Sequence, residues 1–94
     1  MKSQHVDGAD KGKVFLYTLS TCIWCRKLKI FLNEQGVAYD YLDVDQQTRD
    51  DRAEARDEVL EYNPSISFPT MVVNNGQAVI VGFDPAKVQE ILKL

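Results

Sequence analysis

Two cysteines separated by two residues constrain this chain more than any other feature. Cys22 and Cys25 are the only cysteines among its 94 residues. They directly follow Val14–Thr18, a short apolar, β-branched and aromatic run that predicts a buried strand. After them, apolar residues recur at helical spacing up to Gly36, a residue typical of a helix end. The pair is therefore expected where a strand ends and a helix begins.

This position favours redox chemistry at the cysteine pair. Free N–H groups and the positive end of the helix dipole stabilise a thiolate, which is the attacking species in thiol–disulfide exchange. We therefore predict Cys22 as the nucleophile and Cys25, about one turn further on, as the thiol that resolves the mixed disulfide. A purely structural bridge is disfavoured, because a loop this small constrains the unfolded chain little.

A Cys-x-x-Cys pair can also be half of a zinc site, which normally takes four protein ligands, or three and a water. The chain has no further cysteine, and its one histidine, His5, lies far away near the N-terminus. A closed zinc site cannot be assembled from these residues within one chain. We therefore predict no metal and no bound cofactor, with glutathione as a possible reductant.

The remaining patterns alternate between strands and helices. The predicted elements after the first strand are a helix that ends before Gly36, a strand at 37–44, a charged helix within 45–62 capped by Asp45 or Thr48, strands at 70–73 and 78–81 around an Asn75-Gly76 hairpin turn, and a last helix that begins at Asp84-Pro85. The order β-α-β-α-β-β-α predicts an α/β protein. One four-stranded mixed sheet flanked by helices, as in the thioredoxin fold, follows from this order.

Length and composition limit the remaining possibilities. A chain of 94 residues allows one domain, and we expect a disordered tail over 1–11 and a domain over 12–94. The net charge of −3 argues against nucleic-acid binding. No apolar run approaches the ~20 residues that span a membrane, and the first residues lack the apolar stretch of a secretory signal. We therefore expect a cytoplasmic monomer.

Three segments of the chain resemble glutaredoxins. They are Tyr17 to Cys25, Phe68-Pro69-Thr70 and Val81 to Pro85, and the resemblance extends from about Val14 to Leu94. It implies a thioredoxin-type fold and a dithiol oxidoreductase that reduces protein disulfides or glutathione mixed disulfides. The family includes the small redoxins that donate electrons to ribonucleotide reductase.

The resemblance also implies a substrate-binding surface around the cysteines. Pro69 would follow a cis peptide bond and face the cysteines, and the backbone of Phe68 would pair in β fashion with the substrate. Asp84 would hold the γ-glutamyl end of glutathione, although a helix cap explains it equally well. Trp24 is expected to be exposed as a contact residue. The implied contact residues are Thr21, Trp24, Phe68, Pro69, Gly82, Phe83 and Asp84.

The sequence departs from the family pattern next to the cysteines. Leu19 stands where glutaredoxins usually carry a lysine that pairs with a glutathione carboxylate, a charge-assisted contact worth about 1.5–3 kcal/mol. Arg52 or Arg56 can replace it if the second helix points that way. The electron donor therefore stays open between glutathione and a thioredoxin-reductase-type protein.

Two other function classes compete with the reductase. Some glutaredoxins hold an iron–sulfur cluster between two chains with glutathione, but those members often lack the second cysteine, which is present here as Cys25. An inert interaction protein would need neither Cys22 nor Cys25. The cysteine pair therefore favours the reductase over both alternatives.

Overall fold

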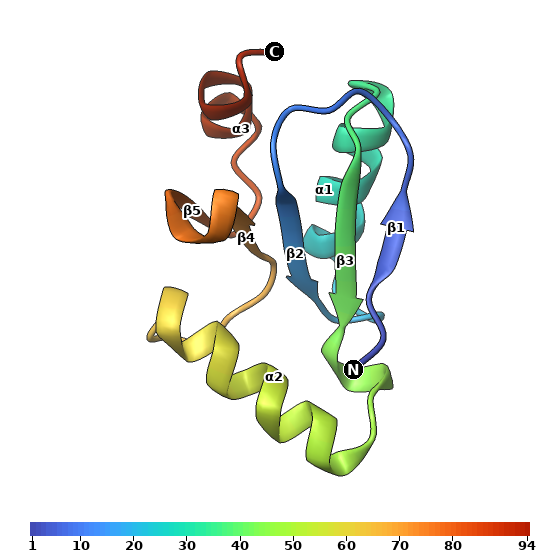
Figure 1. Cartoon of the computed structure of the whole chain (residues 1–94), viewed down its shortest axis with the longest axis vertical. Coiled ribbons are helices and arrows are strands. Elements are labelled where there is room, and N and C mark those ends of the chain that lie inside the picture. Colours follow the sequence, from blue (N-terminus) through green and yellow to red (C-terminus); the bar gives the residue numbers. More distant parts are fainter.

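The computed structural model describes residues 1–94. The chain folds into a five-stranded mixed sheet with helices on both faces (Figure 1). Its elements are β1 (Gln4–Val6), β2 (Val14–Thr18), α1 (Ile23–Glu34), β3 (Tyr39–Asp43), α2 (Arg49–Tyr62), β4 (Thr70–Val73), β5 (Ala78–Val81) and α3 (Pro85–Leu92). The strand order is β1-β3-β2-β4-β5, in which only β2 and β3 run parallel. The α/β class and the thioredoxin-type layout are thereby confirmed.

The alternation of side chains along the central strands divides the core between two faces. On one face, Leu16 and Met71 pack against apolar residues of α1 and α3. On the other face, Tyr17 and Val72 pack against Ala55 of α2 and its neighbours. Figure 1 shows α2 crossing the end of the sheet toward which β2 and β3 point, which is the end at which α1 begins. The fold therefore brings α2 to the same end as the cysteines.

The N-terminal segment differs from the expected disordered tail over 1–11, so the sheet has five strands rather than four. Its strand β1 pairs antiparallel with the outer edge of β3, whose other edge pairs with β2. The chain then passes so close to the turn after α1 that a Cβ at Gly8 would lie 2.6 Å from the Gly36 oxygen. Glycine at position 8 therefore allows this close approach.

Smaller differences concern element ends and packing. The strand predicted at 37–44 is shorter, because Val37 still belongs to the turn that closes α1. The hairpin between β4 and β5 is present, but its turn is longer than the predicted two residues and runs from Asn74 to Gln77. Both Asn74 and Asn75 in this turn have positive φ. Phe31 and Tyr41 are only partly buried against the core.

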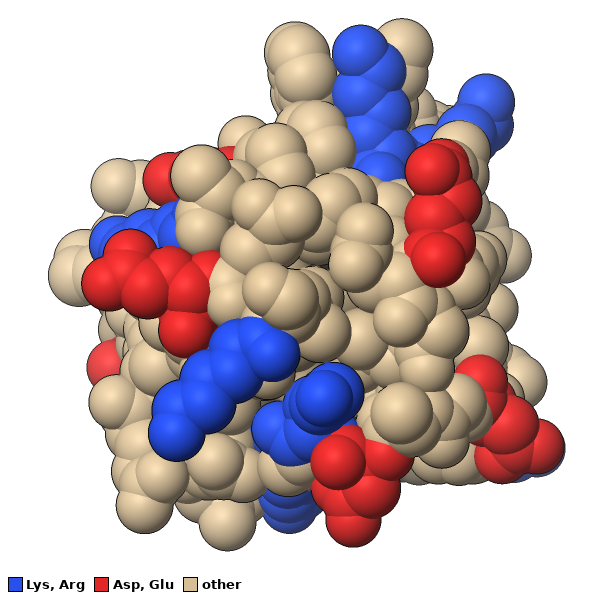
Figure 2. Space-filling view, turned by 90° about the horizontal axis from the view of Figure 1, so that it is seen from above, with Lys and Arg blue, Asp and Glu red and all other residues tan.

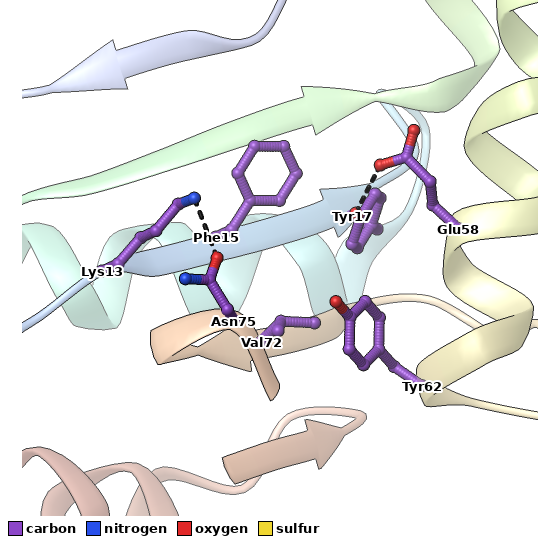
Figure 3. Close-up of a pocket in the computed structure, with 7 residues that line it drawn as sticks. All are labelled: Lys13, Phe15, Tyr17, Glu58, Tyr62, Val72 and Asn75. Atoms are coloured by element: carbon purple, nitrogen blue, oxygen red, sulfur yellow. Dashed lines mark hydrogen bonds between the residues drawn. The ribbon is translucent and has the colours of Figure 1, made fainter. Parts of the chain in front are cut away.

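One hydrogen bond ties α2 to the sheet. The Tyr17 hydroxyl on β2 donates to a Glu58 carboxylate oxygen on α2 at 2.9 Å. Burial, reinforced by Glu58, raises the pKa of the Tyr17 phenol, so this hydroxyl remains a donor at neutral pH. Figure 3 shows the two side chains meeting at the end of a cavity of about 210 Å³ whose lining also includes Phe15 and Tyr62. No cysteine lines this cavity.

Loss of this bond is expected to weaken the attachment of α2. Tyr17→Phe removes one partly buried hydrogen bond, so the free energy of unfolding should fall by about 1 kcal/mol. Urea unfolding followed by circular dichroism measures the difference. Tyr62→Phe is the matched control, because the Tyr62 hydroxyl makes no hydrogen bond within the protein. Equal stability of the two variants would contradict the role of the Tyr17–Glu58 bond.

The pairing of β1 with β3 includes a titrating side chain. The His5 Nδ1 lies 2.7 Å from Asp40 Oδ1, and its Nε2 lies 3.0 Å from Asp7 Oδ1. The hydrogen bond with Asp40 raises the pKa of His5 above 6.5, followed by smaller contributions from the two carboxylates. A raised histidine pKa stabilises the pairing below pH 6.5, and this contribution is lost as the pH rises through the folded value.

We therefore expect the ring-proton resonances of His5 to titrate with a midpoint above pH 6.5 in the native protein. In Asp40→Asn, the midpoint should move back toward 6.5, because the main partner has lost its charge. Amide hydrogen exchange in β1 should also accelerate as the pH rises through this midpoint. The acceleration should exceed the ordinary increase of exchange with pH, which is measured in His5→Gln. An unchanged midpoint in Asp40→Asn would show that Asp40 does not bind the imidazolium.

Candidate functional site

The first cysteine caps a helix. Cys22 precedes α1 with extended backbone angles, and its Sγ accepts a hydrogen bond from the Cys25 N–H at 3.2 Å. Its carbonyl accepts from the Arg26 N–H at 3.1 Å, which begins the helix. An N–H donor and the positive end of a helix dipole both favour negative charge on sulfur. The half-buried Cys22 sulfur therefore lies at the start of the helix, next to a backbone donor.

The second cysteine lies inside the protein. Cys25 is 1% exposed and belongs to the buried side of α1. Burial and, to a smaller extent, the adjacent Cys22 sulfur raise the pKa of the Cys25 thiol to about 12, whereas the charge of Lys29 lowers it. One thiol is thus partly accessible, whereas the other is buried and protonated at neutral pH.

A second loop reaches the cysteines from the start of β4. The Phe68–Pro69 peptide bond is cis, as the resemblance implies. The Cys22 thiol donates a long hydrogen bond to the Phe68 carbonyl oxygen at 3.8 Å. The backbone of this loop therefore lies against the Cys22 sulfur.

A buried asparagine holds this second loop in place. The side-chain amide of Asn63, which is 3% exposed, donates to the carbonyl oxygen and hydroxyl of Ser67 and to the Thr70 hydroxyl. The Thr70 hydroxyl in turn donates to the Ser67 carbonyl at 2.8 Å. No sequence pattern indicates this role of Asn63, because it depends on the burial of the amide beside Ser67 and Thr70.

An acidic residue holds the loop before Cys22. Asp45 accepts the Ser20 N–H at 2.8 Å and also accepts from the Ser20 hydroxyl, while Gln46 donates to the same hydroxyl at 3.1 Å. Partial burial alone would raise the pKa of Asp45, but the Ser20 donors outweigh it and the pKa is lowered. Sequence analysis considered Asp45 only as a cap of α2, a role that Thr48 fills by accepting from the Asp51 N–H.

The remaining predicted contact residues are distributed around the cysteines. The Gly82 N–H donates to the Pro69 carbonyl at 2.8 Å, so the segment after β5 adjoins the second loop. Phe83 stacks on Trp24, with ring centroids 6.3 Å apart, and Trp24 is 52% exposed, as predicted. Asp84 caps α3 by accepting the Lys87 N–H at 3.1 Å. Thr21 is exposed in the loop before Cys22.

A groove of about 400 Å³ lies beside the site. Leu19 and Phe68, from the two loops next to Cys22, form part of its lining. Arg49, Arg52 and Arg56 of α2 line the same groove. The second helix therefore does point its arginines toward the site, which was the condition for them to replace the lysine missing at position 19.

Two further observations concern metal ions and membranes. The structure groups no three His, Cys, Asp or Glu side chains in an arrangement that could hold a metal ion. None of its helices combines the length and the apolar character that a membrane span requires.

Known proteins share both the sequence pattern and this fold. The family model described as Glutaredoxin matches residues 14–79. A glutaredoxin from Methanosarcina mazei Go1 is 44% identical, with a TM-score of 0.90 over 100% of this chain and 90% of that chain. Methanoredoxin from Methanosarcina acetivorans is 40% identical, with a TM-score of 0.88 over 93% and 90% of the two chains.

A curated relative supports the same assignment. It is a glutaredoxin-like 8.6 kDa protein encoded in a rubredoxin operon of Clostridium pasteurianum, and it is 31% identical over 78 residues, which are 83% of this chain and 95% of that protein. The match to the family model covers most of the chain and includes both Cys22 and Cys25. The protein therefore belongs to the glutaredoxin family of the thioredoxin superfamily, with a Cys-x-x-Cys site suited to a thiol oxidoreductase role.

Proposed function

We propose that this protein reduces protein disulfides, or glutathione mixed disulfides, through the dithiol of Cys22 and Cys25. The observation that carries the proposal is the contrast between the two sulfurs. Cys22 is accessible at a helix start and receives an N–H donor, whereas Cys25 is buried and has a raised pKa. Such a pair attacks in a defined order, because only the first thiol can reach a substrate.

The reaction proceeds in two exchanges. The Cys22 thiolate attacks one sulfur of the substrate disulfide, the substrate S–S bond breaks, and the first product leaves as a thiolate that takes up a proton. The Cys25 thiol then loses its proton and attacks the Cys22 sulfur. The mixed disulfide breaks, the second product thiol is released, and the protein keeps the Cys22–Cys25 disulfide. Two electrons have passed from the dithiol to the substrate.

The protein must then be reduced again by an external donor. Glutathione and a thioredoxin-reductase-type protein are the two donor classes that we propose. Arg52 and Arg56, in the groove beside Leu19, supply the cations that a glutathione carboxylate needs. Asp84 at the start of α3 is the partner proposed for its γ-glutamyl end. Parallel assays with glutathione and with a reductase-type donor distinguish the two classes.

Substitution of each cysteine tests the order of attack. Cys22→Ser should abolish reduction of a protein disulfide such as that of insulin, because no accessible thiolate remains. Cys25→Ser should also stop the dithiol reaction but retain part of any glutathione-dependent step that needs one thiol. Full turnover by Cys22→Ser would show that the nucleophile is assigned wrongly.

The difference between the two thiols is also measurable without a substrate. In Cys22→Ser, alkylation of Cys25 by iodoacetamide at pH 8 should be about 100-fold or more slower in the native protein than in urea, because burial and the raised pKa leave little accessible thiolate. Mass spectrometry follows the modification. Cys25→Ser is the matched control, in which Cys22 should show no such protection. Equal protection of both thiols would contradict the proposed division of roles.

A further inference from the structure

We propose that the groove between α2 and the active-site loops binds an acidic, extended segment of the protein substrate, next to the substrate cysteine that bonds to Cys22. This inference rests on the proposed disulfide reduction and specifies its substrate. Three features carry it: the segregation of charge on α2, the lack of partners for its arginines, and the place of the groove relative to the nucleophile.

The charges of α2 lie on opposite sides of the helix. At about 100° per residue, Arg49, Arg52 and Arg56 fall within an arc of about 60°. The acidic residues of the helix fall within an arc centred about 170° from the arginines; they are Asp50, Asp51, Glu54, Asp57, Glu58 and Glu61. The basic side of the helix is the one that lines the groove. A chain with a net charge of −3 therefore presents a cationic surface beside its cysteines.

The arginines of the groove are free to bind an external group. All three are exposed, and none has a carboxylate within ion-pair distance, since the ion pairs of the structure involve other cations. Asp45 also lines the groove, but its oxygens are occupied by Ser20 and Gln46. An anionic ligand would thus gain partners without breaking existing ion pairs.

The extent of the arginine row favours a peptide over a small thiol. Arg49 and Arg56 are seven residues apart, which is about 10.5 Å along the helix. That distance is about three residues of extended chain and exceeds the reach of one carboxylate. Ile23 and Trp24, next to Cys22, are 60% and 52% exposed, and such apolar surface beside a site is typical of contact with a protein.

The groove also lies where a bound substrate must pass. Phe68 contributes both to the groove lining and to the carbonyl oxygen 3.8 Å from the Cys22 sulfur. An extended chain that pairs with the Phe68 backbone is therefore adjacent to the arginines. The opposite end of the molecule differs in character: Figure 2 shows acidic and basic side chains interspersed there. Charge complementarity thus directs an acidic segment to the end that holds the cysteines.

Peptide substrates provide the test. Three peptides of one sequence, each joined through its cysteine to a small neutral thiol, carry three Glu, three Gln or three Lys residues beside that cysteine. With the native protein at low salt, kcat/KM should be on the order of 10-fold higher for the Glu peptide than for the Gln peptide, and lowest for the Lys peptide. The preference for the Glu peptide should diminish as salt is added.

Charge reversal assigns the preference to the groove. In Arg52→Glu/Arg56→Glu, the ratio of kcat/KM for the Glu peptide to that for the Gln peptide should fall below one. Lys11→Glu/Lys93→Glu is the matched control, because it changes the net charge equally at exposed positions outside the groove and should keep the native ratio. A preference that both double variants lose equally would show that net charge, not the groove, causes it.

The outcomes separate the inference from the function on which it rests. Equal turnover of all three peptides by the native protein would overturn the inference and leave disulfide reduction intact. No turnover of any peptide by the native protein would overturn the proposed reduction of protein disulfides itself. Charge reversal that impairs reaction with glutathione but leaves the peptide preference unchanged would assign the groove to a small thiol and overturn the inference.

Discussion

The start of α1 at Cys22 is the constraint on which the rest of the site depends. A helix that begins at this residue places the Cys22 sulfur against a free N–H group and turns Cys25, three positions later, into the core. The difference in burial and in protonation between the two thiols follows from this single register. A shift of the helix by one residue would rotate both cysteines by about 100° about its axis and remove this arrangement.

Polar groups whose hydrogen bonds are satisfied within the protein hold the two loops around Cys22. Asp45 binds the loop before the cysteine, and the buried amide of Asn63 binds the loop that contains Phe68. Both residues come from segments next to α2, which the Tyr17–Glu58 bond ties to the sheet. The position of α2 and the geometry around Cys22 are therefore linked.

Much of the fold was predictable because its signals are local. The apolar strands, the cap at Asp84 and the turn at Gly36 each depend on residues close in sequence. Strand β1 was not predictable, since a three-residue strand with Val6 as its one apolar residue gives no periodic pattern. Its hydrogen bonds are made to β3, more than thirty residues away. The role of Asp45 likewise depends on Ser20 in a distant segment, and that of Asn63 on the burial of its amide beside Ser67 and Thr70.

The short strand β1 also has a consequence for the behaviour of the chain in concentrated solution. Without it, β3 would present a free row of backbone donors and acceptors to which an edge of another molecule could add. With it, the outermost strand is three residues long and carries polar His5 in its middle. So short and polar an edge is a poor template for intermolecular pairing, so the segment protects this edge of the sheet against self-association.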